Sequence, residues 1–162
     1  MVTRRNLLQT GTAIAGGLFV TACAGGGAAA EKEIFEVTRT DAEWRKLLSP
    51  EAYAVLRHES TETPGSSPLN AEKRKGIFAC AGCDLPAYCS ATKFESGTGW
   101  PSFYQPLPDA LKEKTDWTLG MSRTEVHCSR CGGHHGHVFN DGPRPTGLRY
   151  CINGVALKFL PA

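Results

Sequence analysis

The chain has 162 residues and a formal net charge of +2, which suits one ordinary domain and is too short for two sizeable ones. Apolar residues make up 41% and charged residues 21%, so a packed soluble core is expected rather than wholesale disorder. Arg4 and Arg5 supply the whole positive surplus, which argues against a protein that binds nucleic acid by neutralising phosphates. Seven cysteines are a high count for this length, and any interpretation must explain them.

The N-terminal segment has the layout of an export signal. Positions 6–30 carry no charged residue, and the more apolar stretch 13–22 is too short to span about 30 Å of hydrocarbon. Residues 3–8, TRRNLL, resemble the twin-arginine motif, which directs already folded proteins to export.

A lipid anchor is expected at the end of this signal. Residues 20–23, VTAC, resemble the lipobox of bacterial lipoproteins, in which the chain is cut before the cysteine and the cysteine carries lipid. We therefore expect an export signal at 1–22, a tether at 23–33 with Cys23 lipidated, and the folded domain at 34–162. The alternative is a cleaved soluble signal with Cys23 incidental.

Two short helices are expected at the start of the domain. Thr40 can cap the first, and Ser49 can cap the second with Pro50 at its first position. Apolar residues at helical spacing predict the buried faces, which are Trp44, Leu47 and Leu48 in the first helix and Tyr53, Val55 and Leu56 in the second.

The remainder of the chain predicts a mainly β domain. Alternating apolar residues between turn signals indicate strands at Gly76–Cys80, Thr118–Cys128, His135–Phe139, Leu148–Ile152 and Val155–Leu160. Asn153-Gly154 predicts a two-residue hairpin turn between the last two strands.

Four cysteines form two Cys-x-x-Cys pairs, which predict one zinc ion. The pairs are Cys80 with Cys83 and Cys128 with Cys131. Four thiolates complete a tetrahedral shell with no open position, so the metal should be structural. We expect Gly82 and Gly132 to occupy turns that favour a residue without a Cβ. Disulfides are the alternative, because exported proteins usually oxidise their cysteines.

Cys151 lies outside these pairs, within a predicted strand. There Arg149 and Cys151 should face one side while Leu148, Tyr150 and Ile152 face the other. A guanidinium nearby favours the thiolate, which is the nucleophilic form. A small buried residue or a disulfide partner remains the alternative.

Histidines and a tryptophan add candidate site residues. His134, His135 and His137 follow the second pair, and imidazole can donate a proton near neutral pH. An auxiliary metal site or solvated turn histidines are the alternatives. The glycines and proline around Trp100 mark a tight turn that could hold the ring at the rim of a pocket, or the ring could belong to the core.

Taken together, these motifs resemble the B class of peptide methionine sulfoxide reductases. Besides the two cysteine pairs, the motifs are KFESGTGWPSF at 93–103, GHVFNDGP at 136–143 and RYCIN at 149–153. The resemblance runs from about Ile34 to Phe159. It implies two antiparallel sheets with short N-terminal helices, a structural zinc away from the active site, and reduction of the R epimer of methionine sulfoxide in proteins.

The resemblance also implies roles for individual residues. Cys151 matches the nucleophile, which becomes a sulfenic acid. The other matches are His134 and His137, which bind the substrate oxygen and assist proton transfer; Asn153 and Arg149, which orient or activate the cysteine; Trp100 and Phe139, which contact the substrate; and Glu125 and Thr61, which fall at pocket positions.

One position departs from the family pattern. Many members carry a resolving cysteine where this chain has Thr98, so that recycling route is absent. Cys89 is the remaining unpaired cysteine of the domain, and we expect either that it resolves Cys151 or that an external thioredoxin-like protein reduces the sulfenic acid directly.

Two rival functions explain part of the sequence. A zinc-ribbon binding module accounts for the cysteine pairs but not for the strand with Cys151, the histidines or the signal. A thiol–disulfide oxidoreductase would use one Cys-x-x-Cys as a free redox pair. We favour a monomeric repair enzyme for oxidised proteins, held in the periplasm or cell envelope with the membrane reached only through the lipid.

Overall fold

The computed structural model describes residues 33–118 and 120–162. The predicted signal at 1–22 lies outside the described residues. The predicted tether at 23–33, including Cys23, also lies outside them, except for its last residue, Glu33. Within the described part, no helix has the length and apolarity that crossing a membrane requires.

Both predicted helices are present. Helix α1, Asp41–Leu47, begins at Thr40 with a reciprocal capping box to Glu43, and α2, Pro50–His58, begins at Ser49 and ends at the left-handed Glu59. All but one of the predicted apolar residues are buried; Leu47 is 48% exposed, so its predicted place in the core is wrong. It lies at the last residue of α1, where the chain turns into the next cap.

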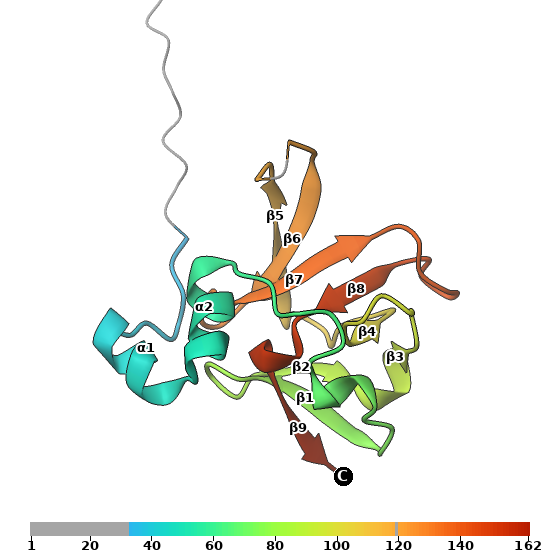
Figure 1. Cartoon of the computed structure of the whole chain (residues 1–162), viewed down its shortest axis with the longest axis horizontal. Coiled ribbons are helices and arrows are strands. Elements are labelled where there is room, and N and C mark those ends of the chain that lie inside the picture. The colour runs from blue at the N-terminus through green and yellow to red at the C-terminus, as the bar shows by residue number, and fades with distance from the viewer. Residues whose placement is uncertain (1–32, 119) are drawn as a thin grey trace, which may run out of the picture. The chain divides into compact units, whose positions relative to one another are not determined.

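Two antiparallel sheets make up the rest of the domain (Figure 1). The smaller has the order β2-β1-β9, from Pro86–Cys89, Gly76–Cys80 and Leu157–Pro161. The larger has the order β3-β4-β8-β7-β6-β5, from Lys93–Phe94, Ser102–Phe103, Arg149–Ile152, His134–Phe139, Arg123–Cys128 and Leu111–Asp116. The predicted mainly β fold with two antiparallel sheets is therefore confirmed.

The last two strands do not form the predicted hairpin. A 3₁₀ turn, Gly154–Ala156, follows β8, and β9 then pairs with β1 in the other sheet. The predicted strand over Thr118–Cys128 is also too long, because β6 starts at Arg123. The preceding β5 was not predicted; it is a polar edge strand, LKEKTD, whose only buried residue is Asp116.

The space between the sheets is filled by aromatic and aliphatic side chains. Tyr88 of β2 stacks on Phe103 of β4 with ring centroids 4.4 Å apart, and Phe78 of β1 meets the same ring edge-on. Tyr150 and Ile152 of β8 belong to this core cluster. Because side chains alternate along a strand, Cys151 between them points away from the core.

Candidate active site and metal centre

The four paired cysteines converge into one cluster. Their sulfur atoms all lie within 4.8 Å of one another. Cys80 Sγ lies 3.7 Å from Cys131 Sγ, and Cys83 Sγ lies 3.5 Å from Cys128 Sγ. Sulfur atoms about 3.8 Å apart are what a tetrahedral zinc with bonds of about 2.3 Å requires. The residues therefore fit a closed four-thiolate metal centre, and none of the four is in a disulfide.

Each cysteine pair turns through one residue with positive φ. Gly132 has φ of +67°, and a Cβ there would lie 2.4 Å from the Phe35 ring, so its predicted need for glycine is confirmed. The prediction for Gly82 is wrong, because a Cβ at that position would make only ordinary contacts. The first pair turns instead at Asp84, which has φ of 58°.

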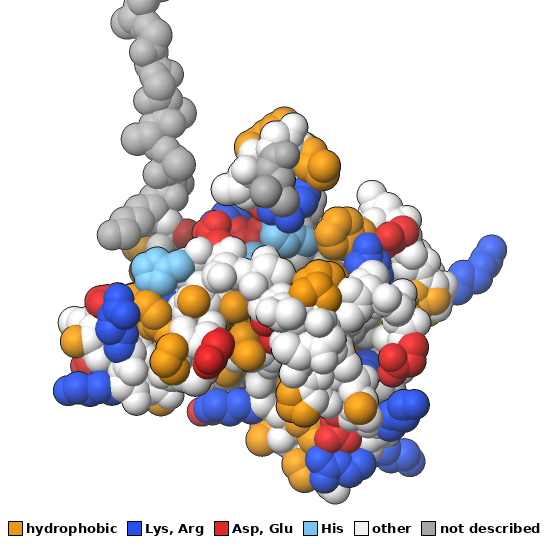
Figure 2. Space-filling view, in the orientation of Figure 1, with side chains coloured by type: hydrophobic (Ala, Val, Ile, Leu, Met, Phe, Trp, Pro, Cys, Tyr) orange, Lys and Arg blue, Asp and Glu red, His pale blue; other side chains and the backbone are white. Residues whose placement is uncertain are grey.

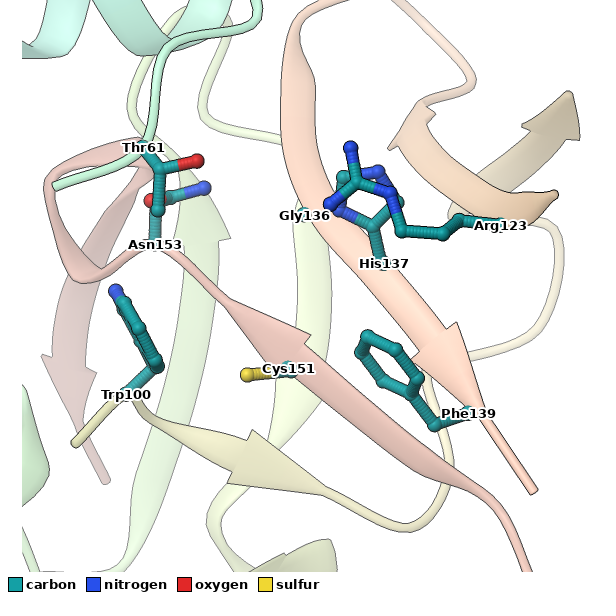
Figure 3. Close-up of a pocket in the computed structure, with 8 residues that line it drawn as sticks. All are labelled: Thr61, Trp100, Arg123, Gly136, His137, Phe139, Cys151 and Asn153. Carbon is teal, nitrogen blue, oxygen red and sulfur yellow. The ribbon is translucent and has the colours of Figure 1, made fainter. Parts of the chain in front are cut away.

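Cys151 opens into a separate pocket of about 120 Å³ (Figure 3). In the view, its sulfur lies between the rings of Trp100 and Phe139, with polar groups at the opposite rim. The residues that line the pocket are Thr61, Trp100, Arg123, Gly136, His137, Phe139, Cys151 and Asn153. The pocket thus combines an aromatic side with a polar side around one thiol.

Backbone packing fixes the position of Cys151. Its strand β8 lies between β4 and β7, where Cys151 pairs with Ser102 on one side and His137 on the other. A Cβ on Gly136 would lie 2.1 Å from the Cys151 carbonyl oxygen, so only glycine allows β7 and β8 to approach this closely.

Asn153 ties the end of this strand to two other segments. Its Nδ2 donates to the His135 carbonyl at 3.0 Å, and its Oδ1 accepts from the Glu62 amide at 2.9 Å. The Glu62 carboxylate accepts in turn from the amides of Gly154 and Val155. The Trp100 indole donates to the Glu62 carbonyl at 3.2 Å, so one loop holds both the tryptophan and the end of β8.

Opposing effects act on the Cys151 thiol. Burial raises its pKa above the ordinary value, while a hydrogen bond with Thr98 and the charge of Arg149 lower it. Arg149 makes a two-bond ion pair with Asp141 at 2.8 Å and lies over the Phe139 ring at 4.4 Å. The guanidinium therefore favours the thiolate, as predicted, but it does not offset burial.

Each of two histidines hydrogen-bonds to a carboxylate. His137 Nε2 lies 2.8 Å from Asp116 Oδ2, and His134 Nδ1 lies 2.8 Å from Glu125 Oε1. The two rings are 5.5 Å apart between centroids. Burial lowers the pKa of His134 to about 4 and lowers that of His137 despite the opposing effect of Asp116. Both histidines are therefore mainly neutral at pH 7.

The structure brings together most of the predicted site residues. Thr61, Trp100, His137, Phe139, Cys151 and Asn153 line one pocket. His134 does not line it; it lines an adjoining pocket of about 300 Å³ that shares Thr61, Arg123 and His137 with the first. Glu125 and Arg149 lie behind the lining, against His134 and Asp141 respectively.

Cys89 lies elsewhere. It lines a third pocket with Lys73 and Lys75, and that pocket shares no lining residue with the one around Cys151. Its neighbour Tyr88 faces the core between the sheets, so Cys89 points to the outer face of the small sheet.

Sequence reasoning missed three residues of this site. Arg123 lines both adjoining pockets, Asp116 holds His137 and Arg123, and Glu62 holds the turn after β8. The available signal was the pair of opposite charges, Asp116 and Arg123, at the two ends of the stretch DWTLGMSR, whose Trp117 and Met121 are exposed. Figure 2 shows acidic, basic and histidine side chains gathered beneath this hairpin.

Comparison with known proteins agrees with this arrangement. The family model described as the SelR domain matches residues 48–161. The chain is 54% identical over 126 residues to the peptide methionine sulfoxide reductase MsrB of Leptospira interrogans, covering 77% of this chain and 96% of that protein. It is 52% identical over 127 residues to the protein of the same name from Agrobacterium fabrum, covering 78% and 94%.

A third relative comes from an archaeon. The protein of the same name from Methanosarcina barkeri is 54% identical over 124 residues, covering 76% of this chain and 87% of that protein. The chain therefore belongs to the MsrB family of peptide methionine sulfoxide reductases.

Proposed function

We propose that this protein reduces the R epimer of methionine sulfoxide in oxidised proteins and peptides to methionine. The observation that carries the proposal is a single, partly buried thiol, Cys151, in the lining of a pocket with an aromatic side and a polar side. The Trp100 and Phe139 rings suit the methyl and methylene groups of the substrate, and the polar side suits its oxygen. The preference for the R epimer rests on family membership.

In the proposed reaction the Cys151 thiolate attacks the sulfoxide sulfur while a proton reaches the sulfoxide oxygen. The attack forms a bond between the two sulfur atoms. The protonated oxygen then moves from the substrate sulfur to the Cys151 sulfur, the sulfur–sulfur bond breaks, the thioether leaves, and Cys151 becomes a sulfenic acid. The substrate sulfur gains two electrons and the cysteine sulfur loses two. His137 lines the pocket, with His134 behind it; because its Nε2 bonds to Asp116, its other ring nitrogen donates to the sulfoxide oxygen only when the ring is protonated.

An external dithiol then restores the enzyme. One thiol attacks the sulfenic acid and releases water, and the second thiol breaks the mixed disulfide to regenerate the Cys151 thiol. The placement of Cys89 on the outer face of the small sheet favours this direct route, with a thioredoxin-like protein as donor, over an internal disulfide. A Cys89→Ser variant should keep full turnover with such a donor, and a loss of turnover would restore the internal route.

The metal centre is proposed to hold one structural zinc ion. Cys80, Cys83, Cys128 and Cys131 would hold it, and with four thiolates it supplies no open coordination position. This convergence also opposes the rival function of a thiol–disulfide oxidoreductase, because neither cysteine pair is a free redox pair. The binding-module alternative leaves the Cys151 pocket without a role.

A turnover assay tests the proposed reaction. The metal-loaded protein is given separate R and S methionine sulfoxide peptides with a dithiol reductant, and methionine is measured. Wild type should act on the R epimer, and Cys151→Ser should lose activity by at least about 10³-fold. Retained activity in Cys151→Ser, or preference for the S epimer, would overturn the proposal.

We also infer from the sequence that the enzyme works outside the cytoplasm as a monomeric envelope protein. The support is the twin-arginine-like stretch at 3–8 within a signal at 1–22, and the lipobox-like VTAC, which would place lipid on Cys23, the first residue of the tether at 23–33. Cell fractionation of wild type and Cys23→Ser tests this. Wild type should sediment with membranes and the variant should become soluble; wild type in the soluble fraction would contradict lipidation.

A further inference from the structure

Three hydroxyl groups form a chain that ends at the sulfur of Cys151. Thr98 Oγ1 lies 3.8 Å from Cys151 Sγ, and Ser96 Oγ lies 2.8 Å from Thr98 Oγ1. Ser102 Oγ lies 2.7 Å from Ser96 Oγ and donates to the Trp100 carbonyl at 3.2 Å. Each atom is within hydrogen-bond distance of the next, from the thiol to a backbone carbonyl.

The number of protons fixes the direction of this chain when Cys151 is a neutral thiol. A hydroxyl carries one proton and a carbonyl can only accept, so the Ser102 hydroxyl donates its single proton to the Trp100 carbonyl. Ser96 must then donate to Ser102, and Thr98 to Ser96. The proton at the last contact is therefore the S–H of Cys151, which donates to Thr98.

The same heavy atoms accommodate the thiolate if every hydroxyl rotates. The ionised sulfur can only accept, so Thr98 donates to Cys151, Ser96 to Thr98 and Ser102 to Ser96. The Trp100 carbonyl loses one neutral contact, and the sulfur gains a charge-assisted hydrogen bond, which is stronger. We propose that Thr98, Ser96 and Ser102 form a reversible hydroxyl chain that accepts a hydrogen bond from the Cys151 thiol at rest and donates one to its thiolate during reaction.

The chain reorients and does not carry the thiol proton away. Its far end is the Trp100 carbonyl, which has no capacity to take up a proton near neutral pH. The proton of Cys151 therefore leaves through the pocket, where the sulfoxide oxygen needs one. This inference rests on the proposed role of Cys151 as nucleophile. It gives Thr98 the role of supporting the thiolate.

The test measures ionisation of Cys151 directly, without turnover. Full-length metal-loaded protein is alkylated with iodoacetamide across pH, and the peptide containing Cys151 is followed by mass spectrometry. Thr98→Val replaces the hydroxyl with a methyl group of similar size, and we expect the midpoint of Cys151 alkylation to rise by about one pH unit. Thr92→Val is the matched control, because its hydroxyl bonds to the carbonyls of Cys89 and Gln105, and it should leave the midpoint unchanged.

Two further variants separate the chain from a packing effect. Thr98→Ser keeps the hydroxyl and should restore the wild-type midpoint. Ser96→Ala leaves Thr98 in place but interrupts the chain, and the midpoint should rise by about half a unit. It also provides the test if Thr98→Val does not fold. An unchanged midpoint in Thr98→Val, or in Ser96→Ala where Thr98→Val does not fold, would overturn the proposal.

Turnover distinguishes failure of the chain from failure of the proposed function. The proposed hydroxyl chain is wrong, and the proposed function stands, if Cys151 ionises in the hydroxyl variants as it does in wild type while Cys151→Ser is inactive. The function is wrong if Cys151→Ser still reduces the R sulfoxide. If the hydroxyl chain and the proposed function are both correct, Thr98→Val should have a lower kcat/KM at pH 7. The value should recover as pH rises toward the variant's new midpoint for Cys151 alkylation.

Discussion

The metal centre and the pocket both depend on cysteine, but the surroundings of the sulfur atoms differ between them. Four sulfur atoms are placed against one another, 3.5 and 3.7 Å apart in the closest pairs, where a bound metal would make them inert. The Cys151 sulfur instead has a hydroxyl and a guanidinium near it and opens into a pocket. The groups next to each sulfur atom, more than its exposure alone, therefore decide which cysteine reacts.

The two regions also differ in how the backbone holds the cysteine. The metal centre is built on turns, with Gly132 and Asp84 in left-handed conformations. Cys151 lies within the larger sheet, bonded on both sides by β4 and β7. A turn can adjust around an ion, whereas a central strand keeps a nucleophile in one place.

The largest effect is expected at the metal centre. Cys128 is fully buried, and Cys128→Ser removes one of the four candidate ligands; a structural zinc would contribute about 10–16 kcal/mol, which is as large as the usual stability of a domain. We expect the variant to lose metal and cooperative unfolding, measured by metal analysis and circular dichroism. Cys89→Ser is the control and should keep both. A Cys128→Ser protein with one bound metal and wild-type unfolding would contradict the metal centre.

Gly136→Ala should damage the pocket next most strongly. The added Cβ would lie 2.1 Å from the Cys151 carbonyl, so β7 and β8 must separate. We expect a loss of about 3 kcal/mol in stability and about 10²-fold in kcat/KM, from urea unfolding and turnover. Gly82→Ala is the matched control near the metal, where a Cβ makes ordinary contacts at 3.5 Å, and it should stay near wild type. Equal losses of stability and kcat/KM in Gly136→Ala and Gly82→Ala would contradict a special need for glycine at position 136.

His135 should make the domain sensitive to acid. It is fully buried between the two regions, and burial lowers its pKa to about 3, below the 6.5 of the unfolded chain. The unfolded state therefore binds the proton first, so stability is fully present above pH 6.5 and falls as pH drops toward 3. His135 alone should cost about 2 kcal/mol between pH 7 and pH 5.

A leucine at this position isolates that contribution. Neither ring nitrogen of His135 has a hydrogen-bond partner among the described residues, so His135→Leu also removes two buried polar atoms. Urea unfolding at pH 7 and pH 5 should show a smaller loss in the variant than in wild type. The exposed His58→Gln is the control and should retain the wild-type loss. An unchanged acid loss in His135→Leu would exclude His135 as its source.

The smallest effect is expected from the charge near the nucleophile. Arg149→Gln removes a positive charge that lowers the pKa of Cys151 and leaves Asp141, which raises it. The alkylation midpoint of Cys151 should rise by a fraction of a pH unit. Adding Asp141→Asn should recover part of the shift, whereas Arg130→Gln, near the metal centre, should leave the midpoint unchanged. A midpoint that falls in Arg149→Gln would reverse the assigned direction.

Local patterns predicted what is local. The caps at Thr40 and Ser49, the two cysteine pairs and the alternation around Cys151 depend on neighbours in sequence, and each agrees with the structure. Asn153-Gly154 also fits a hairpin locally, but Glu62 bonds the Gly154 and Val155 amides and the chain crosses to the other sheet. A partner 92 residues away leaves no local signal.

The site shows the same limit. The motifs predicted Cys151, Trp100 and Asn153, whose side chains do lie together. They did not predict that Asp116 would hold His137, because that contact depends on the pairing of β5 with β6 and of β6 with β7. Because the sequence of β5 is polar, no strand was predicted there, although β5 carries the Asp116 carboxylate.

The crossing from β8 to β9 has a consequence for folding during synthesis. The chain places Cys151 in the large sheet and, six residues later, begins the strand that completes the small sheet against β1. Pairing of β1 with β9 brings Gly76 beside Pro161, 85 residues later, so the small sheet is complete only once β9 has been made. A nascent chain that stops before β9 should therefore leave the core between the sheets without Leu157 and Phe159, and the strand that carries Cys151 would lack part of its packing.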